Sequence, residues 1–218
     1  LSSPAVSDID KDGKMETIFA STDGKIYVVD KDGKNKPGWP VQLPNDIYSS
    51  FTQVGCSSPS VSDIDNDSKE EIIVRDGHQV YVYGYDGRTK KGWPKQMDGY
   101  LNGNGVISSP VIADLDNDGE KEILLTNVGW GYNGEIIVFK SNGSIMPGWP
   151  VVIPLNWVFS TIFINPVVSD LDGDGNVEII LQCLDEKLKK GYLYVFDKMG
   201  NILSGWPREI GIGSRTSP

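Results

Sequence analysis

An acidic nonapeptide that recurs four times constrains the fold of this chain more than any other feature. The copies start at Asp8, Asp63, Asp114 and Asp170, between 51 and 56 residues apart in a chain of 218 residues. A fixed period of this length is typical of repeat architectures, in which each repeat contributes one supersecondary unit. The sequence therefore predicts a single array over residues 1–218. Its repeats are expected at about 1–56, 57–107, 108–164 and 165–213, with residues 214–218 opening a fifth.

Each repeat divides into four short β-rich stretches separated by turn residues, and helical periodicity is not sustained anywhere. In the first repeat the expected strands are Pro4–Ile9, Glu16–Ser21, Lys25–Asp30 and Gly38–Leu43. The counterparts of the second strand are 71–75, 122–126 and 178–182, and those of the third are 79–83, 135–140 and 192–197. Four strands per repeat predict an all-β fold, a β-propeller built of four-stranded antiparallel blades.

A Gly-Trp-Pro motif follows each acidic loop by about thirty residues, at Gly38, Gly92, Gly148 and Gly205. Proline cannot donate a hydrogen bond to a strand ladder, so the motif predicts that the fourth strand is the outer edge of the blade. We expect the tryptophan to cover the blade or its contact with the next one.

The acidic loops have the donor pattern of calcium sites. Carboxylates at positions one, three, five and nine, with the carbonyl of position seven, supply oxygen ligands, and a small residue at position six lets the backbone turn. The candidate ligands are Asp8, Asp10, Asp12, Lys14 and Glu16; Asp63, Asp65, Asp67, Lys69 and Glu71; Asp114, Asp116, Asp118, Glu120 and Glu122; and Asp170, Asp172, Asp174, Asn176 and Glu178. The sequence thus predicts up to four Ca²⁺ ions, one per repeat, with a structural role.

The second loop departs from the pattern because Ser68 stands where the other three have glycine. A positive φ at position six would strain serine, so the second site is expected to be weaker or empty.

Composition restricts the class of function. The chain has 39% hydrophobic and 23% charged residues, as ordinary globular proteins do, and a formal net charge of −10. The loop carboxylates account for this acidity, and without a basic stripe nucleic acid is not an expected ligand. No apolar run has the length of a membrane span. Cys56 and Cys183 are expected to be buried free thiols rather than a disulfide framework.

The acidic loop, the preceding Ser-Pro-x-Val and the following Gly-Trp-Pro together resemble the FG-GAP and VCBS repeats of integrin-like β-propellers. The resemblance implies blades around a central axis, a calcium ion between the first two strands of each blade, and an extracellular or cell-surface setting. The EF-hand shares the opening of the loop but needs an acid at position twelve. Here that position holds the apolar residues Phe19, Val74, Leu125 and Leu181, which excludes an EF-hand.

The number of blades leaves several assemblies open. Closed propellers have four to eight blades. The four repeats are therefore expected to be part of a seven- or eight-bladed ring, a complete small ring, or half of a homo-oligomer, and we favour a piece of a larger propeller.

The blade end opposite the calcium loops is the expected recognition surface. Length variation between repeats is concentrated there, in segments 43–56, 97–107, 127–134, 154–165 and 184–191. Variable loops on a rigid scaffold often carry binding function, and aromatic side chains beside amides suit a glycan or a protein ligand. Packing between blades is the competing interpretation of these aromatics. The candidate ligand-binding residues are Tyr48, Tyr100, Trp130, Tyr132 and Trp157.

Catalysis finds little support in the sequence. The single histidine, His78, is expected in a surface turn without a nucleophile partner, and no zinc, phosphate-loop or nucleophile-elbow motif is present. We therefore expect a non-catalytic binding or adhesion module. The alternative is the propeller of an extracellular polysaccharide-active enzyme such as a calcium-dependent lyase.

Overall fold

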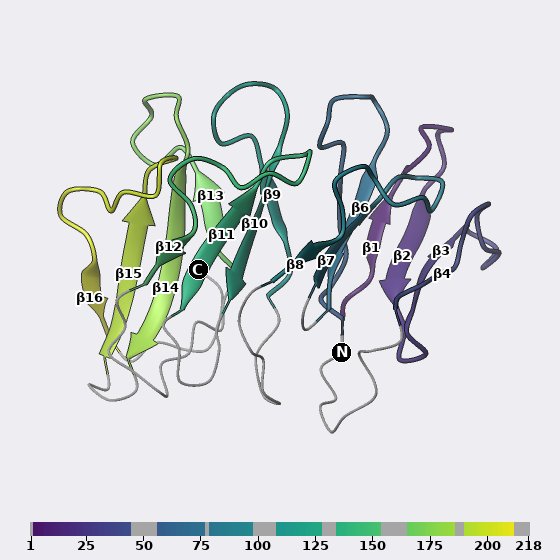
Figure 1. Ribbon diagram of the computed structural model, residues 1–218, viewed down its shortest axis with the longest axis horizontal. Helices are drawn as coiled ribbons and strands as arrows, with labels where there is room; N and C mark the ends of the chain where they lie inside the picture. Colours follow the sequence, from purple (N-terminus) through teal and green to yellow (C-terminus); the bar gives the residue numbers. More distant parts are fainter. Residues whose placement is uncertain are drawn as a thin grey trace.

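The computed structural model describes residues 2–44, 56–76, 79–97, 108–127, 134–153, 165–185 and 190–211. Within these ranges all regular structure is β: sixteen strands form four four-stranded sheets, and there is no helix (Figure 1). Each sheet is antiparallel throughout and corresponds to one sequence repeat. The predicted blade architecture is confirmed.

The strand bounds are as follows. Blade 1 contains β1 (Ala5–Ser7), β2 (Glu16–Ala20), β3 (Lys25–Val29) and β4 (Val41–Gln42). Blade 2 contains β5 (Ser60–Ser62), β6 (Glu71–Arg75), β7 (Gln79–Tyr83) and β8 (Lys95–Gln96). Blade 3 contains β9 (Val111–Ala113), β10 (Glu122–Asn127), β11 (Glu135–Phe139) and β12 (Val151–Val152). Blade 4 contains β13 (Val167–Ser169), β14 (Glu178–Asp185), β15 (Lys190–Phe196) and β16 (Arg208–Ile210).

The first strands of blades 1, 2 and 3 lie next to one another, because β1 contacts β5 and β5 contacts β9. Within a sheet the strands follow chain order, so the short fourth strand is the outer edge, as predicted. The register at the acidic loop is the same in every blade: the last residue of the first strand pairs with the loop glutamate, as in Ser7↔Glu16 and Ser169↔Glu178. The repeats are thus structurally equivalent where the candidate metal ligands begin.

The first and fourth strands are shorter than the sequence predicts. The first strand of blade 1 ends at Ser7 rather than Ile9, because Asp8 already bonds the amides of the following turn. The fourth begins at Val41 rather than Gly38, because Trp39 N donates to Lys36 O in a turn in which Gly38 has φ +88°. All four Trp-Pro peptide bonds are cis.

The second and third strands of blade 4 are instead longer than predicted. Their ladder continues through Cys183↔Tyr192 to Asp185↔Lys190, beyond the expected bounds of 178–182 and 192–197. In the other blades the middle strands differ from the expected bounds by at most one residue at either end.

Among the described residues, the hydrophobic core lies between the blades, in three separate clusters. Each cluster joins one blade to the next: Ile18 and Val28 meet Tyr81 and Tyr83 of blade 2, and equivalent sets join blades 2 and 3 and blades 3 and 4. Alternate residues of a strand face opposite sides of the sheet, so β6 sends Ile72 toward blade 1. Burial between sheets is therefore what orders the array.

The tryptophan of each Gly-Trp-Pro motif packs on the next blade. Trp39 lies edge-on to Tyr83, with ring centroids 6.0 Å apart, and its Nε1–H donates to Tyr85 O at 2.9 Å. Trp93 and Trp149 donate in the same way to Ser141 O and Lys198 O. The expectation that this side chain seals the contact with the next blade is confirmed for the first three blades.

The glycine of that motif allows the blades to approach. A Cβ built on Gly38 would lie 1.9 Å from Asp86 O, a distance no side chain could tolerate, so only glycine fits this contact.

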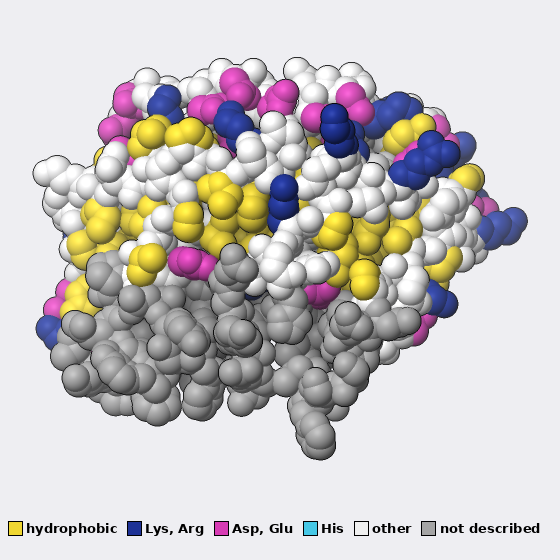
Figure 2. Space-filling model, viewed as in Figure 1, with side chains coloured by type: hydrophobic (Ala, Val, Ile, Leu, Met, Phe, Trp, Pro, Cys, Tyr) yellow, Lys and Arg dark blue, Asp and Glu magenta, His cyan; other side chains and the backbone are white. Residues whose placement is uncertain are grey.

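The acidic loops gather at one end of the blades. Figure 2 shows Asp and Glu side chains concentrated along that end, with a band of hydrophobic side chains across the middle of the molecule. Cys56 and Cys183 are free thiols, as expected, but only Cys183 is fully buried; Cys56 is half-buried, and this burial raises its pKa to about 11. In the part of the chain that the structure describes, no helix has the length and hydropathy needed to cross a membrane.

Candidate metal centres

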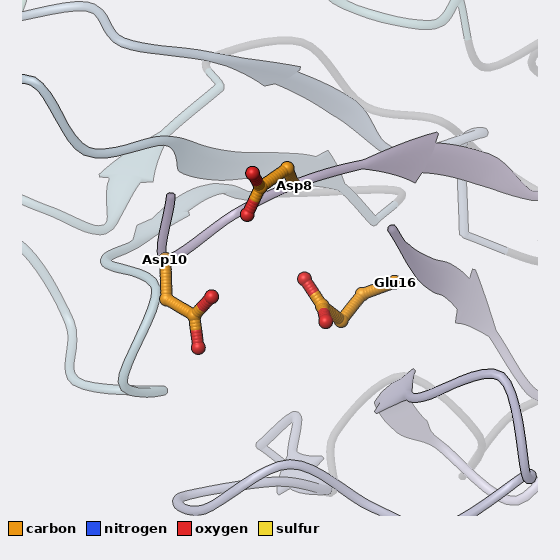
Figure 3. Close-up of side chains that lie close together, drawn as sticks. All are labelled: Asp8, Asp10 and Glu16. Carbon is orange, nitrogen blue, oxygen red and sulfur yellow. The ribbon is translucent and has the colours of Figure 1, made fainter. Parts of the chain in front are cut away.

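Each blade brings three carboxylates together, from positions one, three and nine of the acidic loop. In every triad one oxygen per residue lies within 4.8 Å of the others. Figure 3 shows the first triad, in which Asp8 and Asp10 approach Glu16 from across the loop. The triads are Asp8, Asp10 and Glu16; Asp63, Asp65 and Glu71; Asp114, Asp116 and Glu122; and Asp170, Asp172 and Glu178.

The position-one aspartate shapes the turn. Asp8 accepts hydrogen bonds from the amides of Asp12 and Gly13, at 3.0 and 2.9 Å. The equivalent aspartates accept the position-six amide at the same place in all four loops. This local bonding explains why an acidic sequence forms a tight turn despite the repulsion between its charges.

The position-nine glutamate is the buried member of the triad. In Glu122, one oxygen accepts the Leu115 amide at 2.8 Å while the side chain is fully excluded from solvent. The same bond, from the position-two amide, recurs in the other three blades. Burial raises the pKa of Glu122 to about 7, and it also raises the pKa of Glu71. These glutamates clamp the loop to the second strand and keep a second oxygen facing the triad.

The position-five aspartates bond their own loop. Each accepts the amide of position seven, as Asp12 does from Lys14 at 2.8 Å. The ligand roles expected of positions five and seven therefore stay predictions, namely Asp12, Lys14, Asp67, Lys69, Asp118, Glu120, Asp174 and Asn176.

The backbone of the loop is left-handed at two positions. Position six has φ between +69° and +91°, so Ser68 adopts the conformation that the other loops give to glycine. Position four is also left-handed in every copy: Lys11, Asn66, Asn117 and Gly173 have φ between +59° and +80°. The left-handed backbone at position four was not predicted from the sequence, although asparagine and glycine, which adopt this conformation readily, occupy that position in three of the four loops.

A lysine ammonium lies among the carboxylates of the first three loops. Lys36 Nζ is 2.8 Å from Asp10 and 3.1 Å from Glu16, and Lys90 Nζ is 2.7 Å from Asp65 and 3.0 Å from Glu71. In the third loop Lys140 Nζ is 2.7 Å from Asp116. Hydrogen bonding to Asp10 raises the pKa of Lys36. Burial alone would lower the pKa of Lys90, but its bonds to Asp65 and Glu71 outweigh burial and raise it.

The fourth loop differs, because among the described residues no ammonium pairs with its three triad carboxylates. The lysines are the main feature of the site that sequence reasoning missed.

The geometry fits a bound cation. Oδ1 of Asp10, Asp65 and Asp116 and Oε1 of Glu122 are buried without a hydrogen-bond partner. Buried polar atoms are normally paired, and oxygens left in this state indicate a missing partner. An all-carboxylate donor set suits a hard cation such as Ca²⁺, for which these three residues per loop are the candidate holders.

A second buried charged cluster lies at the other end of blades 2 and 3. Arg75 is fully buried and its Nη1 donates to Thr126 O at 2.6 Å. Burial lowers the pKa of Arg75 to about 10, opposed by the charges of Asp76 and Glu135. Asp76 also accepts a 2.7 Å bond from Tyr81 Oη. The sequence signal for this cluster is the pair Arg75 and Asp76 at the end of the second strand, where the other three repeats have uncharged residues.

The candidate ligand-binding residues Tyr48, Tyr100, Trp130, Tyr132 and Trp157 lie outside the described residues, as does His78. Their proposed roles stay predictions.

Comparison with known proteins agrees with this geometry. The model of the FG-GAP-like repeat matches twice, over residues 8–74 and 63–125, each match beginning in one acidic loop and ending in the next repeat. The chain belongs to the FG-GAP-like repeat family.

The FG-GAP-like chain is also similar to individual proteins. It is 30% identical over 111 residues to rhamnogalacturonan exolyase YesX of Bacillus subtilis (strain 168), covering 43% of the chain but 18% of the relative. Solved structures with the same fold include BBS1N in complex with ARL6DN (TM-score 0.61, 14% identity, 95% of this chain and 56% of that chain). Another is the Pseudomonas aeruginosa PilY1 C-terminal domain (TM-score 0.59, 18% identity, 86% and 39%). The FG-GAP-like chain therefore spans a minor part of this relative and about half or less of these structures.

Proposed function

We propose that this chain is a calcium-stabilised, non-catalytic binding module that recognises a glycan or protein ligand outside the cell or at its surface. The observation that carries the proposal is the equivalence of the four triads. Each blade uses the same buried glutamate to tie its loop to the second strand. A catalytic centre requires one distinctive constellation, whereas four equivalent clamps favour a structural ion in every blade.

Calcium is the proposed ion because the donors are oxygens and the loops have no thiol or imidazole. Extracellular calcium modules bind the ion weakly and fill because calcium is abundant outside the cell, so the proposed setting is extracellular.

The proposed recognition surface is the blade end opposite the acidic loops. Support comes from the buried cluster around Arg75, which cross-links blades 2 and 3 at that end. A rigid platform beneath variable segments favours binding there, because less ordering is needed when the ligand arrives. Trp130 and Tyr132 are the first residues to replace.

One specific observation favours a second candidate function. The similarity to a rhamnogalacturonan exolyase makes the chain a candidate for the propeller part of an extracellular polysaccharide-active enzyme. Under that alternative the same acidic loops would support a catalytic propeller.

A glycan array that includes rhamnogalacturonan, read with calcium and with chelator, tests the main proposal. We expect calcium-dependent binding that Trp130→Ala and Tyr132→Ala weaken about tenfold or more, the usual cost of losing an aromatic contact. Met199→Ala, an exposed apolar change at the acidic-loop end, serves as the control. Binding that survives both aromatic changes would exclude this surface. New ultraviolet absorbance from an unsaturated product would favour the lyase alternative.

A further inference from the structure

The acidic loops of the first three blades are joined to one another through the backbone. Ile9, at position two of the first loop, uses its amide for its own loop and its carbonyl for the next. The amide donates to Glu16 Oε2 at 3.2 Å, and the carbonyl oxygen accepts a hydrogen bond from Glu70 N at 3.3 Å. Glu70 immediately precedes Glu71, the buried member of the second triad. One residue therefore connects the glutamates of two successive triads.

The second loop repeats this connection toward the third. Ile64 N donates to Glu71 Oε2 at 3.0 Å, and Ile64 O accepts a hydrogen bond from Lys121 N at 2.9 Å. Lys121 immediately precedes Glu122, whose Oε2 accepts the Leu115 amide at 2.8 Å. A hydrogen-bonded path, made of these backbone and glutamate groups, therefore runs from the first triad through the second to the third.

Burial and side-chain contacts support this path. The two position-two isoleucines are fully buried, so their hydrogen bonds lie in a low-dielectric environment that strengthens them. Lys11 pairs with Glu70 beside the first connection, and Lys121 Nζ donates to Ser62 Oγ at 2.8 Å beside the second. The strands that lead into these loops are also adjacent, because β1 contacts β5 and β5 contacts β9. The first three loops thus share one set of contacts.

The fourth loop is connected differently. Its position eight is Val177, and among the described residues the Val177 amide donates to no backbone carbonyl of the third loop. These two loops meet through an exposed side-chain bond, from Asn117 Nδ2 to Gly175 O at 3.3 Å. The third loop therefore has two neighbours, one joined to it by a backbone hydrogen bond and the other by a surface side chain.

We propose that calcium binding in the first three loops is positively cooperative and that the fourth loop binds calcium independently. An ion bound in one triad fixes its position-nine glutamate, and through the path it also orders the residue beside the glutamate of the adjoining triad. The next ion then binds a loop that is already partly ordered, which is a coupling free energy between sites. Neutral hydrogen bonds limit this coupling to about twofold to tenfold in affinity per neighbour. The inference rests on the calcium role proposed above.

Calcium titration followed by amide NMR spectroscopy tests the coupling one loop at a time. The position-six amides of Gly13, Gly119 and Gly175 donate to the first aspartate of their triads, so each signal reports ion binding in its own loop. Glu71→Gln weakens the second site, while the new amide oxygen can still accept the Ile64 bond. We expect the calcium concentration at half-saturation to rise about threefold or more at Gly13 and Gly119, and to stay within about twofold at Gly175.

The matched control is Glu178→Gln, which makes the same change in the other neighbour of the third loop. Both variants remove one negative charge beside that loop, so a general electrostatic effect would lower its calcium affinity in both. We expect Gly119 to respond to Glu71→Gln and not to Glu178→Gln. Equal losses of affinity at Gly119 in the two variants would overturn the proposal. Tighter binding there in Glu71→Gln would also overturn it, because it would show that repulsion between neighbouring ions dominates.

Removal of the backbone donor tests the path itself. Lys121→Pro lacks the amide that bonds Ile64 O, whereas Lys121→Ala retains it. In a double-mutant cycle, Glu71→Gln should no longer change the affinity at Gly119 in the proline background, and coupling that persists there would overturn the path. Should the proline variant not fold, unchanged half-saturation at Gly119 in Glu71→Gln alone still overturns the proposal. Amide signals that do not respond to calcium in any loop would refute calcium binding itself.

Discussion

Lys36 holds the place that a cation would take in the first acidic loop. Its ammonium contacts Asp10 and Glu16, two members of the triad. A divalent ion bound there would have to displace this ammonium, so we expect the lysine to lower calcium affinity. A loop without such a lysine, such as the fourth, should bind calcium more tightly. Affinity would then differ between loops of almost identical sequence.

Replacing Lys36 by methionine should raise calcium affinity at the first loop by about tenfold, roughly 1.4 kcal/mol. Methionine fits this position, because blade 3 has the buried Met146 there. Calcium titration calorimetry measures the change. Lys34→Met, at an exposed residue with no ion pair among the described contacts, is the matched control. Equal affinity in both variants would show that Lys36 does not compete with calcium.

Ser68 adopts φ +69°, a conformation that costs a side chain about 1 kcal/mol and costs glycine little. Ser68→Gly should therefore stabilise the protein by about 0.5–1 kcal/mol in urea unfolding with chelator present. The reverse change at the equivalent position, Gly13→Ser, should destabilise it by a similar amount. Destabilisation by Ser68→Gly would show that the hydroxyl makes a favourable contact in the loop.

At the scale of the strand, local sequence predicts the middle of each blade better than its edges. The second and third strands of blade 2 match the expected bounds, since their β-branched and aromatic residues alternate between two buried faces. The ends of β1 and β4 depend on hydrogen bonds that their own residues do not reveal, such as Asp8 to Gly13. Because of these hydrogen bonds, β1 and β4 are shorter than the hydrophobic pattern alone predicts.

In the candidate metal sites, too, the residues fixed by local sequence could be predicted and those contributed by distant segments could not. Positions one, three and nine could be predicted because the spacing within one loop fixes them. The lysines could not, because Lys36 lies twenty residues beyond Glu16 and Lys140 reaches its loop from a different position. The Arg75 cluster also depends on a neighbouring blade, through Thr126. Contacts between distant strands and between blades therefore could not be predicted from the acidic-loop motif alone.

The tryptophan contact between blades supports a prediction at this scale. Trp93→Phe removes the hydrogen bond to Ser141 O and part of a buried ring, which should destabilise the chain by about 2–3 kcal/mol. The comparison is Trp206→Phe, because among the described residues the Trp206 indole has no hydrogen-bond acceptor and the cost should be under about 1 kcal/mol. Urea unfolding measures both. Equal losses would mean that the contact with the next blade contributes little.

At the scale of the molecule, the metal loops and the interblade cores act on the same folding equilibrium. In blades 2 and 3 the glutamate ties its loop to a second strand whose side chains enter the cores on both sides. Calcium bound in one loop should therefore stabilise neighbouring blades too.

Calcium removal should lower the melting temperature of the whole chain in one transition. An ion that binds only the folded state at 100 times its dissociation constant adds about 2.7 kcal/mol per site. Glu122→Gln should remove one such contribution, because the amide can still accept the Leu115 bond but supplies no charge to the ion. Glu120→Gln, in the same loop but outside the triad, should retain it. Calorimetric melting with calcium, with magnesium and with chelator distinguishes these cases, and magnesium should substitute poorly because it prefers a smaller octahedral site. Melting curves that are identical with calcium and with chelator would refute a stabilising ion and leave the ammonium groups as the only cations of these loops.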